Sequence, residues 1–255
     1  TEDDAVSALL LREMKKQGIA VRLDTGVTRV DSSARGVQVA TSSGDPVNAE
    51  CVLVAVGRSL NSAGIGAEAA GLPVGTRGEL SVNDELETGV DGVWAIGDVI
   101  GRKQLAHAAS AQGEVAAERV MGRDARLAWD HIPAGIFTAP EIGSVGLTEA
   151  QARATGREIA VGEFPFRGLA KAHVLGEIAG FVKVVADKAT GRVVGAHIIG
   201  PHAAELIHEA VVALQAGAGA EDLVRAIHVH PTLAEVVREA AAAVHGAAIH
   251  AVRKG

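Results

Sequence analysis

The chain has 255 residues, enough for one large domain or two ordinary ones. Hydrophobic residues make up 48% and aromatic residues only 2%, so the core must be built from aliphatic side chains. The net charge is −7 and the lysines and arginines are scattered, which excludes nucleic acid as an expected partner because phosphate binding needs a clustered basic face. No apolar run approaches the roughly 20 residues of a membrane span. No basic-then-apolar leader opens the chain, and we expect a cytoplasmic protein.

The first 56 residues are predicted to form a helix followed by short strands. Apolar residues recur at helical spacing over 4–17, and Gly18 stands in the C-cap position. Strands are expected at 19–23, 27–30, 36–41 and 47–56. The single cysteine, Cys51, lies in the last strand, where we expect a small buried side chain, and no intramolecular disulfide can form.

The next region contains a carboxylate placed where ligands bind. Residues 57–89 are rich in glycine and polar side chains, and 64–71 is expected to be a loop that leads into a short helix. A short buried strand is predicted at 92–97 and an alanine-rich helix at 104–120. Asp98 follows the strand, at the edge where open α/β sheets bind ligands. The N-terminus of the helix beyond it favours electron-rich or anionic atoms. Taken alone, a structural turn is the alternative reading.

From residue 133 the pattern changes to strands first and helices last. Strands are expected at 142–147, 159–164, 180–186 and 193–199. Thr148 and Gln151 form a capping box that opens a helix to Thr155. Further helices are expected at 203–216, 220–227 and 231–245. This order is typical of an α+β domain with an antiparallel sheet.

The segment 228–235 (HVHPTLAE) has the composition of an acid–base site. Pro231 is expected at the first helical position. His230 lies just before the helix and Glu235 about one turn in, so the carboxylate can reach back to one ring nitrogen. That contact would fix the tautomer and leave the other nitrogen free for proton transfer. The alternative is a capped helix with two incidental histidines. His228 is assigned only a structural role.

Several segments resemble the pyridine nucleotide-disulfide oxidoreductases. Residues 88–98 (TGVDGVWAIGD) resemble the second flavin-contacting segment of that family. Residues 55–61 (AVGRSLN) resemble its crossover, with Leu60 in place of the usual proline. The motif at 228–235 is similar to the His-Pro-Thr-x-x-Glu of dihydrolipoamide dehydrogenase and glutathione reductase, and 241–250 is most like the lipoamide branch. Residues 137–149, 180–183 and 195–200 resemble the dimerisation domain, so the resemblance covers nearly the whole chain.

The resemblance implies which residues contact FAD. Asp98 would bind the ribityl chain of the cofactor. Leu105 and Ala106 would lie against the pyrimidine edge of the flavin, and His107 matches in position. Gly57 belongs to the crossover segment and is also assigned to cofactor binding. No metal site is expected.

The resemblance also implies an acid–base pair that works in a homodimer. His230 would serve the dithiol in the active site of the other subunit, and Glu235 would orient its ring. Lys183 and His197 are expected to be surface or sheet residues without a catalytic role. A lipoamide-bearing acyltransferase subunit of a 2-oxoacid dehydrogenase complex is a candidate partner.

The family's reaction runs from a dithiol to an active-site disulfide, to flavin and to NAD. The cysteine pair and the glycine-rich phosphate loops for FAD and NAD are missing from these residues, and Cys51 cannot replace the pair. We therefore expect partial α/β segments, 1–54 from an NAD-binding domain and 55–132 from an FAD-binding domain, followed by an α+β dimerisation domain at 133–255.

The expected function is the C-terminal portion of a flavoprotein that converts dihydrolipoamide and NAD to lipoamide and NADH. This portion alone should be inactive, because it lacks the nucleophilic thiolate and binds both cofactors incompletely. A glutathione reductase-like enzyme and a non-catalytic dimerisation module are the alternatives.

Overall fold

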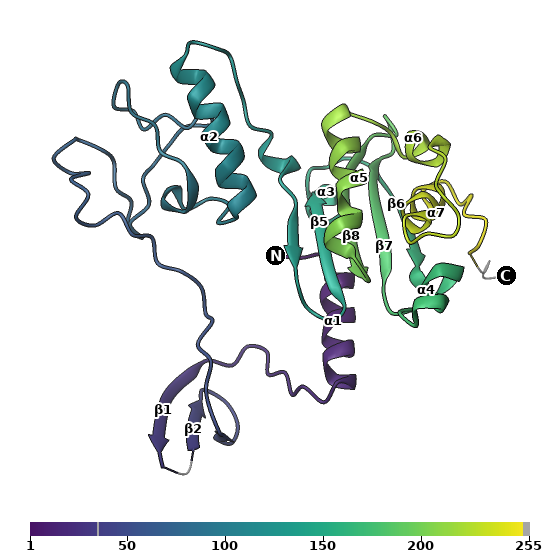
Figure 1. Cartoon of the computed structure of the whole chain (residues 1–255), viewed down its shortest axis with the longest axis horizontal. Coiled ribbons are helices and arrows are strands. Elements are labelled where there is room, and N and C mark those ends of the chain that lie inside the picture. The colour runs from purple at the N-terminus through teal and green to yellow at the C-terminus, as the bar shows by residue number, and fades with distance from the viewer. Residues whose placement is uncertain (35, 252–255) are drawn as a thin grey trace.

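A computed structural model describes residues 1–34 and 36–251. The described chain has three parts (Figure 1): a small sheet, a loop-rich part around one long helix, and a larger part in which helices flank a second sheet. Among the described residues, no helix has the length and apolar character needed to cross a membrane.

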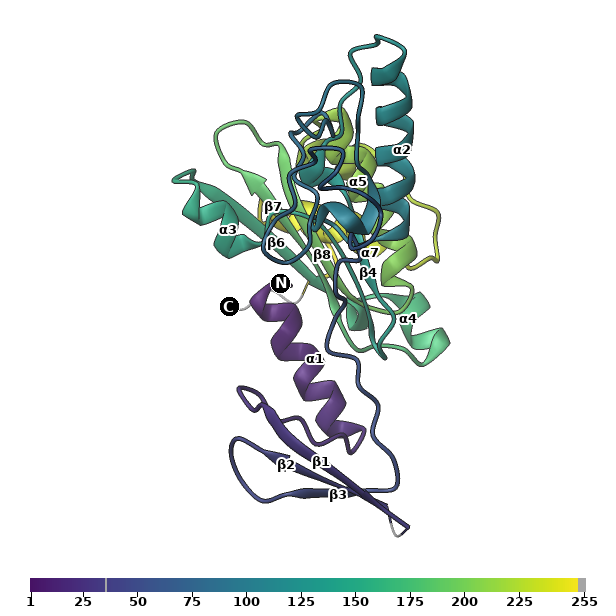
Figure 2. The ribbon, with the colours of Figure 1, turned by 90° about the vertical axis from the view of Figure 1, so that its left-hand side faces the viewer.

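The first helix, α1 (Asp4–Lys16), packs on the larger sheet. Asp3 caps it, with Oδ1 accepting a hydrogen bond from the N–H of Ala5 at 3.0 Å. Val6 and Leu9 are buried against three residues of the larger sheet, Ile142, Phe181 and Ile199. Figure 2 shows α1 between this sheet and the small one. The predicted helix over 4–17 is therefore confirmed, and it connects the two sheets.

The small sheet is antiparallel, in the order β1-β2-β3. Its strands are β1 (Val27–Ser33), β2 (Gly36–Thr41) and β3 (Val47–Ala49). Every residue of β1 and β3 is exposed. The strand expected at 19–23 does not form, and the one expected at 47–56 is reduced to β3.

The prediction that Cys51 is buried in a strand is wrong. Cys51 is exposed. In the apolar run that follows it, Leu53, Val54 and Val56 are 88%, 72% and 93% exposed. An apolar run is buried only where another element covers it. Among the described residues, no strand pairs with the run 52–56, so its side chains stay exposed.

The loop-rich part is organised by α2 (Ala106–Val120) and the 3-10 turn η1 (Gly97–Ile100). Its small core contains Leu80, Leu86, Ala95, Ile100 and Ala116. The strand predicted at 92–97 is reduced to a single bridge between Glu87 and Trp94, although Ala95 is buried as expected. Residues 64–71 form turns and bends, as expected of a loop, but the short helix expected after them does not form among the described residues 72–96.

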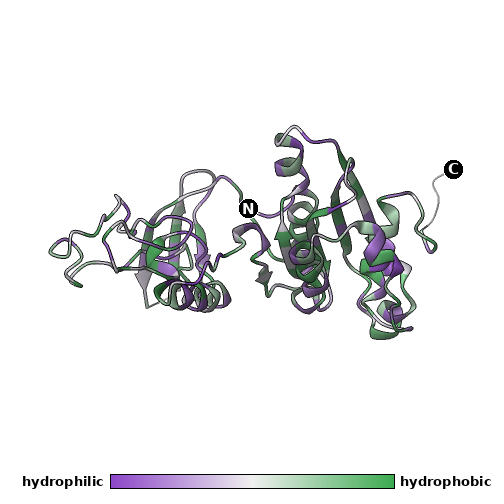
Figure 3. Cartoon of the chain, turned by 90° about the horizontal axis from the view of Figure 1, so that it is seen from above, coloured by the Kyte–Doolittle hydropathy of each residue, from purple (hydrophilic) through white to green (hydrophobic). Residues whose placement is uncertain are grey.

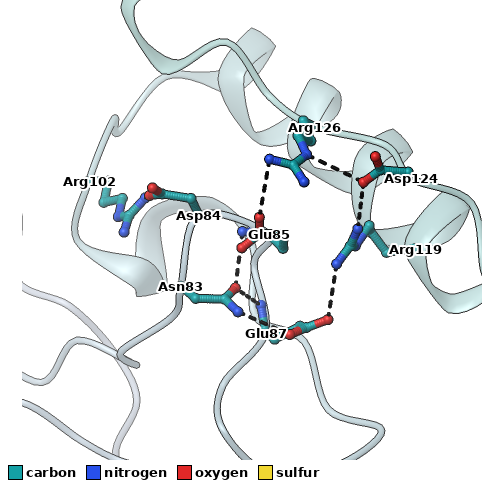
Figure 4. Close-up of polar contacts among 8 residues, drawn as sticks. All are labelled: Asn83, Asp84, Glu85, Glu87, Arg102, Arg119, Asp124 and Arg126. Atoms are coloured by element: carbon teal, nitrogen blue, oxygen red, sulfur yellow. Dashed lines mark hydrogen bonds and ion pairs between the residues drawn. The ribbon is translucent and has the colours of Figure 1, made fainter.

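A network of polar contacts ties the loop at 83–87 to the C-terminal end of α2 (Figure 4). Asn83 Oδ1 accepts a hydrogen bond from the N–H of Glu87 at 2.9 Å. Arg119 of α2 pairs with Glu87 at 3.5 Å and with Asp124 at 3.1 Å, and Asp124 also pairs with Arg126 at 3.3 Å. Exposed ion pairs contribute about 0–1 kcal/mol each. Together they hold the loop at 83–87 and the segment that follows α2 beside the C-terminal end of α2.

The larger sheet has five antiparallel strands in the order β4-β5-β8-β7-β6. The strands are β4 (Ala134–Ile136), β5 (Glu141–Gly146), β6 (Ile159–Pro165), β7 (Phe181–Asp187) and β8 (Val193–Gly200). The helices are α3 (Glu149–Ala154), α4 (Ala170–Leu175), α5 (Ala203–Ala216), α6 (Ala220–Arg225) and α7 (Glu235–Ala243), with 3-10 turns η2 (Trp129–His131) and η3 (Phe166–Gly168). Figure 3 shows the hydrophobic strands between the helices. The antiparallel α+β prediction is confirmed, with the capping box at Thr148; β4 and α4 were not predicted.

The helix α7 packs closely on β6 and β7. Its residues Val236, Val237 and Ala240 are buried in the main core. A Cβ atom at Gly162 of β6 would collide with the backbone of Ala240. Any larger residue at this position would push α7 off the sheet, so a glycine in β6 sets how near the helix lies.

A buried ion cluster joins α1 to the larger sheet. Lys183 of β7 is 6% exposed, and its Nζ lies 2.7 Å from Asp3 Oδ1 and 3.2 Å from Glu149 Oε2. Asp3 Oδ2 also accepts from the N–H of Glu149 at 3.2 Å. Lys183 and its register neighbour His197 are sheet residues as predicted, and both are buried. The cluster places the start of α1 on β7.

Burial and hydrogen bonding oppose each other in setting the pKa values of this cluster. Burial alone would raise the pKa of Asp3, but hydrogen bonds from Lys183 and from backbone N–H groups outweigh it, and the pKa is lowered. The pKa of Glu149 is lowered mainly by its hydrogen bond to Arg153, with Lys183 contributing. Burial by itself would lower the pKa of Lys183, yet the two carboxylates raise it. All three groups are therefore charged at neutral pH.

Replacing Lys183 with methionine should release the start of α1. The substitution leaves Asp3 and Glu149 without their shared counter-charge, and breaking a buried pair from one side costs about 3–5 kcal/mol. Amide hydrogen exchange should accelerate over 4–16 more than over the strands β5–β8. The matched control is Lys16→Met, which removes an exposed partner of Glu13 on the same helix. Equal exchange in the two variants would contradict the prediction.

The attachment of α1 should weaken in acid. A carboxylate whose folded pKa is lowered stabilises the fold above its unfolded value of about 4, and this contribution is lost as the pH falls through the lowered pKa. Glu163 opposes this loss of stability in part. Burial raises the pKa of its carboxyl, so its protonation in acid removes the cost of a buried charge. Amide chemical shifts of α1 should therefore change as the pH falls below about 4, the unfolded value of these carboxyls. In Lys183→Met this pH dependence should be much smaller; an unchanged profile would count against the ion cluster.

Candidate functional site

The loop between α6 and α7 presents a histidine bound to a carboxylate. His230 Nδ1 lies 2.9 Å from Glu235 Oε1, and Glu235 Oε2 accepts a hydrogen bond from the N–H of Thr232 at 2.9 Å. A carboxylate only accepts, so Nδ1 carries the proton in this contact. The His230 side chain is 72% exposed, and Nε2 has no hydrogen-bond partner among the described residues. The geometry thus leaves one ring nitrogen accessible for proton transfer.

The environment keeps Glu235 ionised. Burial alone would raise the pKa of this carboxyl, but the hydrogen bonds from His230 and from the N–H of Thr232 outweigh it, with the charges of His230 and His250 contributing, so the pKa is lowered. Glu235 is the first residue of α7, where the helix dipole also favours a negative charge. A charged Glu235 accepts the hydrogen bond from Nδ1 and so fixes the orientation of the ring.

Pro231 was predicted at the first helical position, and this is wrong. α7 begins at Glu235, and Pro231 lies in the loop, after a cis peptide bond. The hydroxyl of Thr232 donates to the carbonyl of Val229 at 2.7 Å and closes a compact turn. The expected contact between the carboxylate and the ring forms all the same, with Glu235 at the helix start rather than one turn in.

Two further histidine–glutamate pairs lie near this dyad, and the sequence analysis missed both. Glu239 of α7 is buried and accepts from the N–H groups of Ile249 and His250 at 2.8 and 3.1 Å, and its other oxygen lies 3.2 Å from His250 Nδ1. His228 pairs with Glu209 of α5 at 2.8 Å. A cavity of about 370 Å³ beside α7 is lined by members of all three pairs, His228, Glu235, Glu239 and His250 among them.

Asp98, assigned to the ribityl chain, and Gly57, assigned to cofactor binding, line one cleft. Asp98 is in η1, and Arg58 Nη1 lies 3.1 Å from its Oδ2. Gly57, Arg58 and Asp98 line a cleft of about 580 Å³. Both charged side chains remain accessible, at 73% and 43% exposure. The fold thus brings Gly57 and Asp98 together although they are far apart in the sequence.

The other assigned cofactor residues form the start of α2. Leu105 is its N-cap residue and no side chain caps the helix, so the N–H groups of its first turn, including those of Ala106 and His107, point away from the helix without a side-chain acceptor. The ring of His107 is held by the carbonyl of Pro133 at 2.8 Å. Such a helix end is suited to an electron-rich or anionic group.

Gln112 of α2 fixes the turn that carries Asp98, and it was not predicted. Its side chain is fully buried, and Oε1 accepts a hydrogen bond from the N–H of Gly97 at 2.6 Å. The signal in the sequence was a single amide on the inner face of an alanine-rich helix. The contact holds η1 against α2, and so relates Asp98 to the helix start.

The structure does not bring the two sets of assigned residues together within one chain. The cofactor set lies on α2 and its neighbouring loops, while the dyad lies at the start of α7, on the other side of α5 (Figure 1). No group of three or more metal-binding side chains is found among the described residues. A site that uses both sets therefore needs more than one copy of the chain.

Comparison with known proteins agrees with these features. Residues 1–113 match the family model for pyridine nucleotide-disulphide oxidoreductases, and 132–241 match the model for their dimerisation domain. The mitochondrial dihydrolipoyl dehydrogenase of Pisum sativum is 39% identical over 255 residues, which cover 98% of this chain and 51% of that protein. The dihydrolipoyl dehydrogenase of Cupriavidus necator is 40% identical over 95% of this chain and 52% of its own length. A leghemoglobin reductase of Glycine max is 40% identical over 96% and 48%.

Solved structures show the same relationship. LpdA of Mycobacterium tuberculosis superposes with a TM-score of 0.89 at 28% identity, over 94% of this chain and 53% of that one. The HOCl-induced flavoprotein disulfide reductase of Escherichia coli gives 0.85 at 27% identity, over 94% and 56%. The chain spans about half the length of the curated relatives it matches. With two models of one family matched along its length, the chain belongs to the pyridine nucleotide-disulfide oxidoreductase family.

Proposed function

We propose that this chain is the C-terminal half of a flavoprotein that oxidises dihydrolipoamide with NAD. The observation that carries the proposal is the dyad: His230 bonded through Nδ1 to an ionised Glu235, with Nε2 open to solvent. In the proposed reaction Nε2 accepts a proton from the dithiol, and the thiolate that forms attacks a disulfide. Glu235 stabilises the imidazolium that results.

The residues present fit part of a flavin. The uncapped start of α2 offers N–H donors to an electron-rich ring edge, and Asp98 offers a carboxylate to sugar-type hydroxyls. FAD, when bound, supplies the electron-accepting ring. In the proposal Asp98 holds the ribityl chain, Gly57 contributes to the cofactor site, and Leu105, Ala106 and His107 lie at the flavin edge. These residues include no phosphate loop, so binding of FAD and NAD by this chain is incomplete.

We further propose that the dyad acts across a homodimer formed by 133–255. Two exposed apolar side chains precede His230 in the loop: Ile227 at 99% and Val229 at 73%. Such residues at a loop tip are suited to a partner surface. A partner copy would receive His230 beside its own flavin segment, which explains why the two sets lie apart in one chain. In this scheme the dithiol substrate is the lipoamide arm of an acyltransferase subunit.

The domain division proposed is 1–54, 55–132 and 133–255. The family model for the dimerisation domain starts at residue 132, next to the second boundary, and β4 begins at Ala134. α1 is assigned to the first segment although it packs on the sheet of the third. The nucleotide-binding half is therefore anchored to the dimerisation half at α1.

The whole protein should oxidise dihydrolipoamide with NAD. His230→Gln should lower kcat by about 10²–10⁴-fold, which is the usual contribution of an acid–base group to the rate. Glu235→Gln should lower it less, because the ring remains. The readout is NADH absorbance, with NADPH-dependent reduction of glutathione disulfide as the competing assay. The control is His245→Gln, an exposed histidine just after α7. Full activity in His230→Gln would refute the dyad.

The 255-residue chain alone is the negative control of the same assay. It contains one cysteine, which is exposed and remote from the dyad along the chain, so no dithiol–disulfide relay can form. Lipoamide-dependent NADH formation by the purified chain would contradict this expectation.

Light scattering at micromolar concentration should give twice the 25.9 kDa mass of the chain. Ile227→Asp should shift the mass toward the monomer, because a charge would be buried at the proposed interface. Val120→Asp, at an exposed apolar residue of α2, is the matched control. A monomeric mass for the unmodified chain would contradict the homodimer.

A further inference from the structure

The loop that carries His230 has a single inward-pointing anchor. Within the described segment 225–231, every residue except His228 is exposed. The His228 side chain is only 8% exposed, whereas its neighbours Ile227 and Val229 point into solvent. The contacts of His228 therefore determine where residues 225–231 lie relative to the rest of the fold.

Both ring nitrogens of His228 face acceptor atoms. Nδ1 lies 2.9 Å from the carbonyl oxygen of Ala226, a contact within the loop. Nε2 lies 2.8 Å from Glu209 Oε1, on a residue 19 positions earlier in the chain. A carboxylate only accepts, so a ring protonated on Nε2 donates to Glu209. The contact at Nδ1 lies within the loop, and the contact at Nε2 ties the loop to α5.

The helix that supplies Glu209 is a firm support. The adjacent residue Ala210, with Ile207, Ala213 and Leu214, is buried in the main core. The Glu209 carboxylate is 30% exposed. Its place is set by the backbone of α5, which the buried neighbours of Glu209 fix in the core. A charge-assisted hydrogen bond from such a helix holds the backbone at His228 more firmly than contacts within the loop would.

His228 stands two residues before His230, and the two histidines are held from opposite ends of the loop. Glu235 of α7 fixes the ring of His230, and Glu209 of α5 fixes the backbone that leads to it. We propose that Glu209 and His228 are positioning residues that set where His230 Nε2 meets the dithiol. The proposal rests on the proposed function of His230, and neither residue touches the substrate in it.

The test uses the whole protein and two substitutions that break the same bond. Glu209→Ala removes the carboxylate, and His228→Asn keeps an amide for the Ala226 carbonyl but cannot reach α5. Each should lower kcat for dihydrolipoamide oxidation by about 10- to 100-fold, the cost of misplacing a reacting group by up to about 1 Å, with a smaller change in KM. The double variant should be no worse than either single one, because both remove one interaction. Glu209→Gln keeps an oxygen acceptor and should retain most of the activity.

A second readout is independent of activity. Long-range ¹H–¹⁵N spectra of the histidine rings in the 255-residue chain report the tautomer of His230, which should be Nδ1-protonated in the unmodified chain. In Glu209→Ala and His228→Asn the signals of His230 should move toward tautomer-averaged positions, although its own partner Glu235 is unchanged. Glu158→Ala, which removes an exposed carboxylate paired with Lys188, is the control and should leave them in place.

The outcomes separate the two proposals. If kcat and the ring signals of His230 are unchanged in both Glu209→Ala and His228→Asn, the positioning role is overturned. If the whole protein does not oxidise dihydrolipoamide, the proposed function fails, and the ring spectra still decide whether Glu209 positions His230. The same spectra show whether each variant is folded, so a loss of activity through unfolding is recognised directly.

Discussion

The carboxylate of Glu235 is the contact on which the geometry of the candidate site depends. One oxygen holds the His230 ring and the other holds the backbone of Thr232. The carboxylate can do this because α7, which it begins, is fixed to β6 and β7 by a buried apolar face. An exposed loop thereby gains a defined conformation from a helix that is part of the core. Without that support, the histidine would be one more mobile surface side chain.

The strand β7 connects the two halves of the structure. Val182 and Val184 face the core shared with α7, and Lys183 between them points to the other face, where Asp3 begins α1. Side chains alternate along a strand, so one element holds the dyad helix α7 on one face and the start of α1 on the other. The charge on Lys183 is acceptable in the sheet because two carboxylates surround it. A movement of α1 would therefore first change the contacts of Lys183 in β7.

The sequence predicted the parts of the fold whose signals are local. The strands β5–β8 follow from short apolar-rich segments, and the capping box at Thr148 follows from a three-residue spacing. The contact between His230 and Glu235 was predictable because its partners are five residues apart. The pair of His228 and Glu209 was not, since its partners meet only once α5, α6 and the loop have folded.

Other features could not be predicted because they depend on neighbours. Cys51 was expected to be buried, but burial needs a covering element, and among the described residues none covers the run after it. Pro231 fits a helix start by composition, whereas the turn closed by Thr232 moves that start to Glu235. The assignments to FAD came from resemblance, and Gln112 relates Asp98 to the start of α2 through a contact with Gly97 that no local pattern indicates.

The exposed run 52–56 has a consequence for handling this polypeptide. It is apolar, uncharged and free of proline, it follows directly on a small sheet whose outer strands are exposed, and such segments readily pair edge to edge with further copies. Where the run pairs with a different edge of the next copy, the contact is head-to-tail, and such contacts build open chains of molecules rather than a twofold dimer. Self-association that grows with concentration without a plateau would come from this run, and a single charged residue placed within it would act as a gatekeeper.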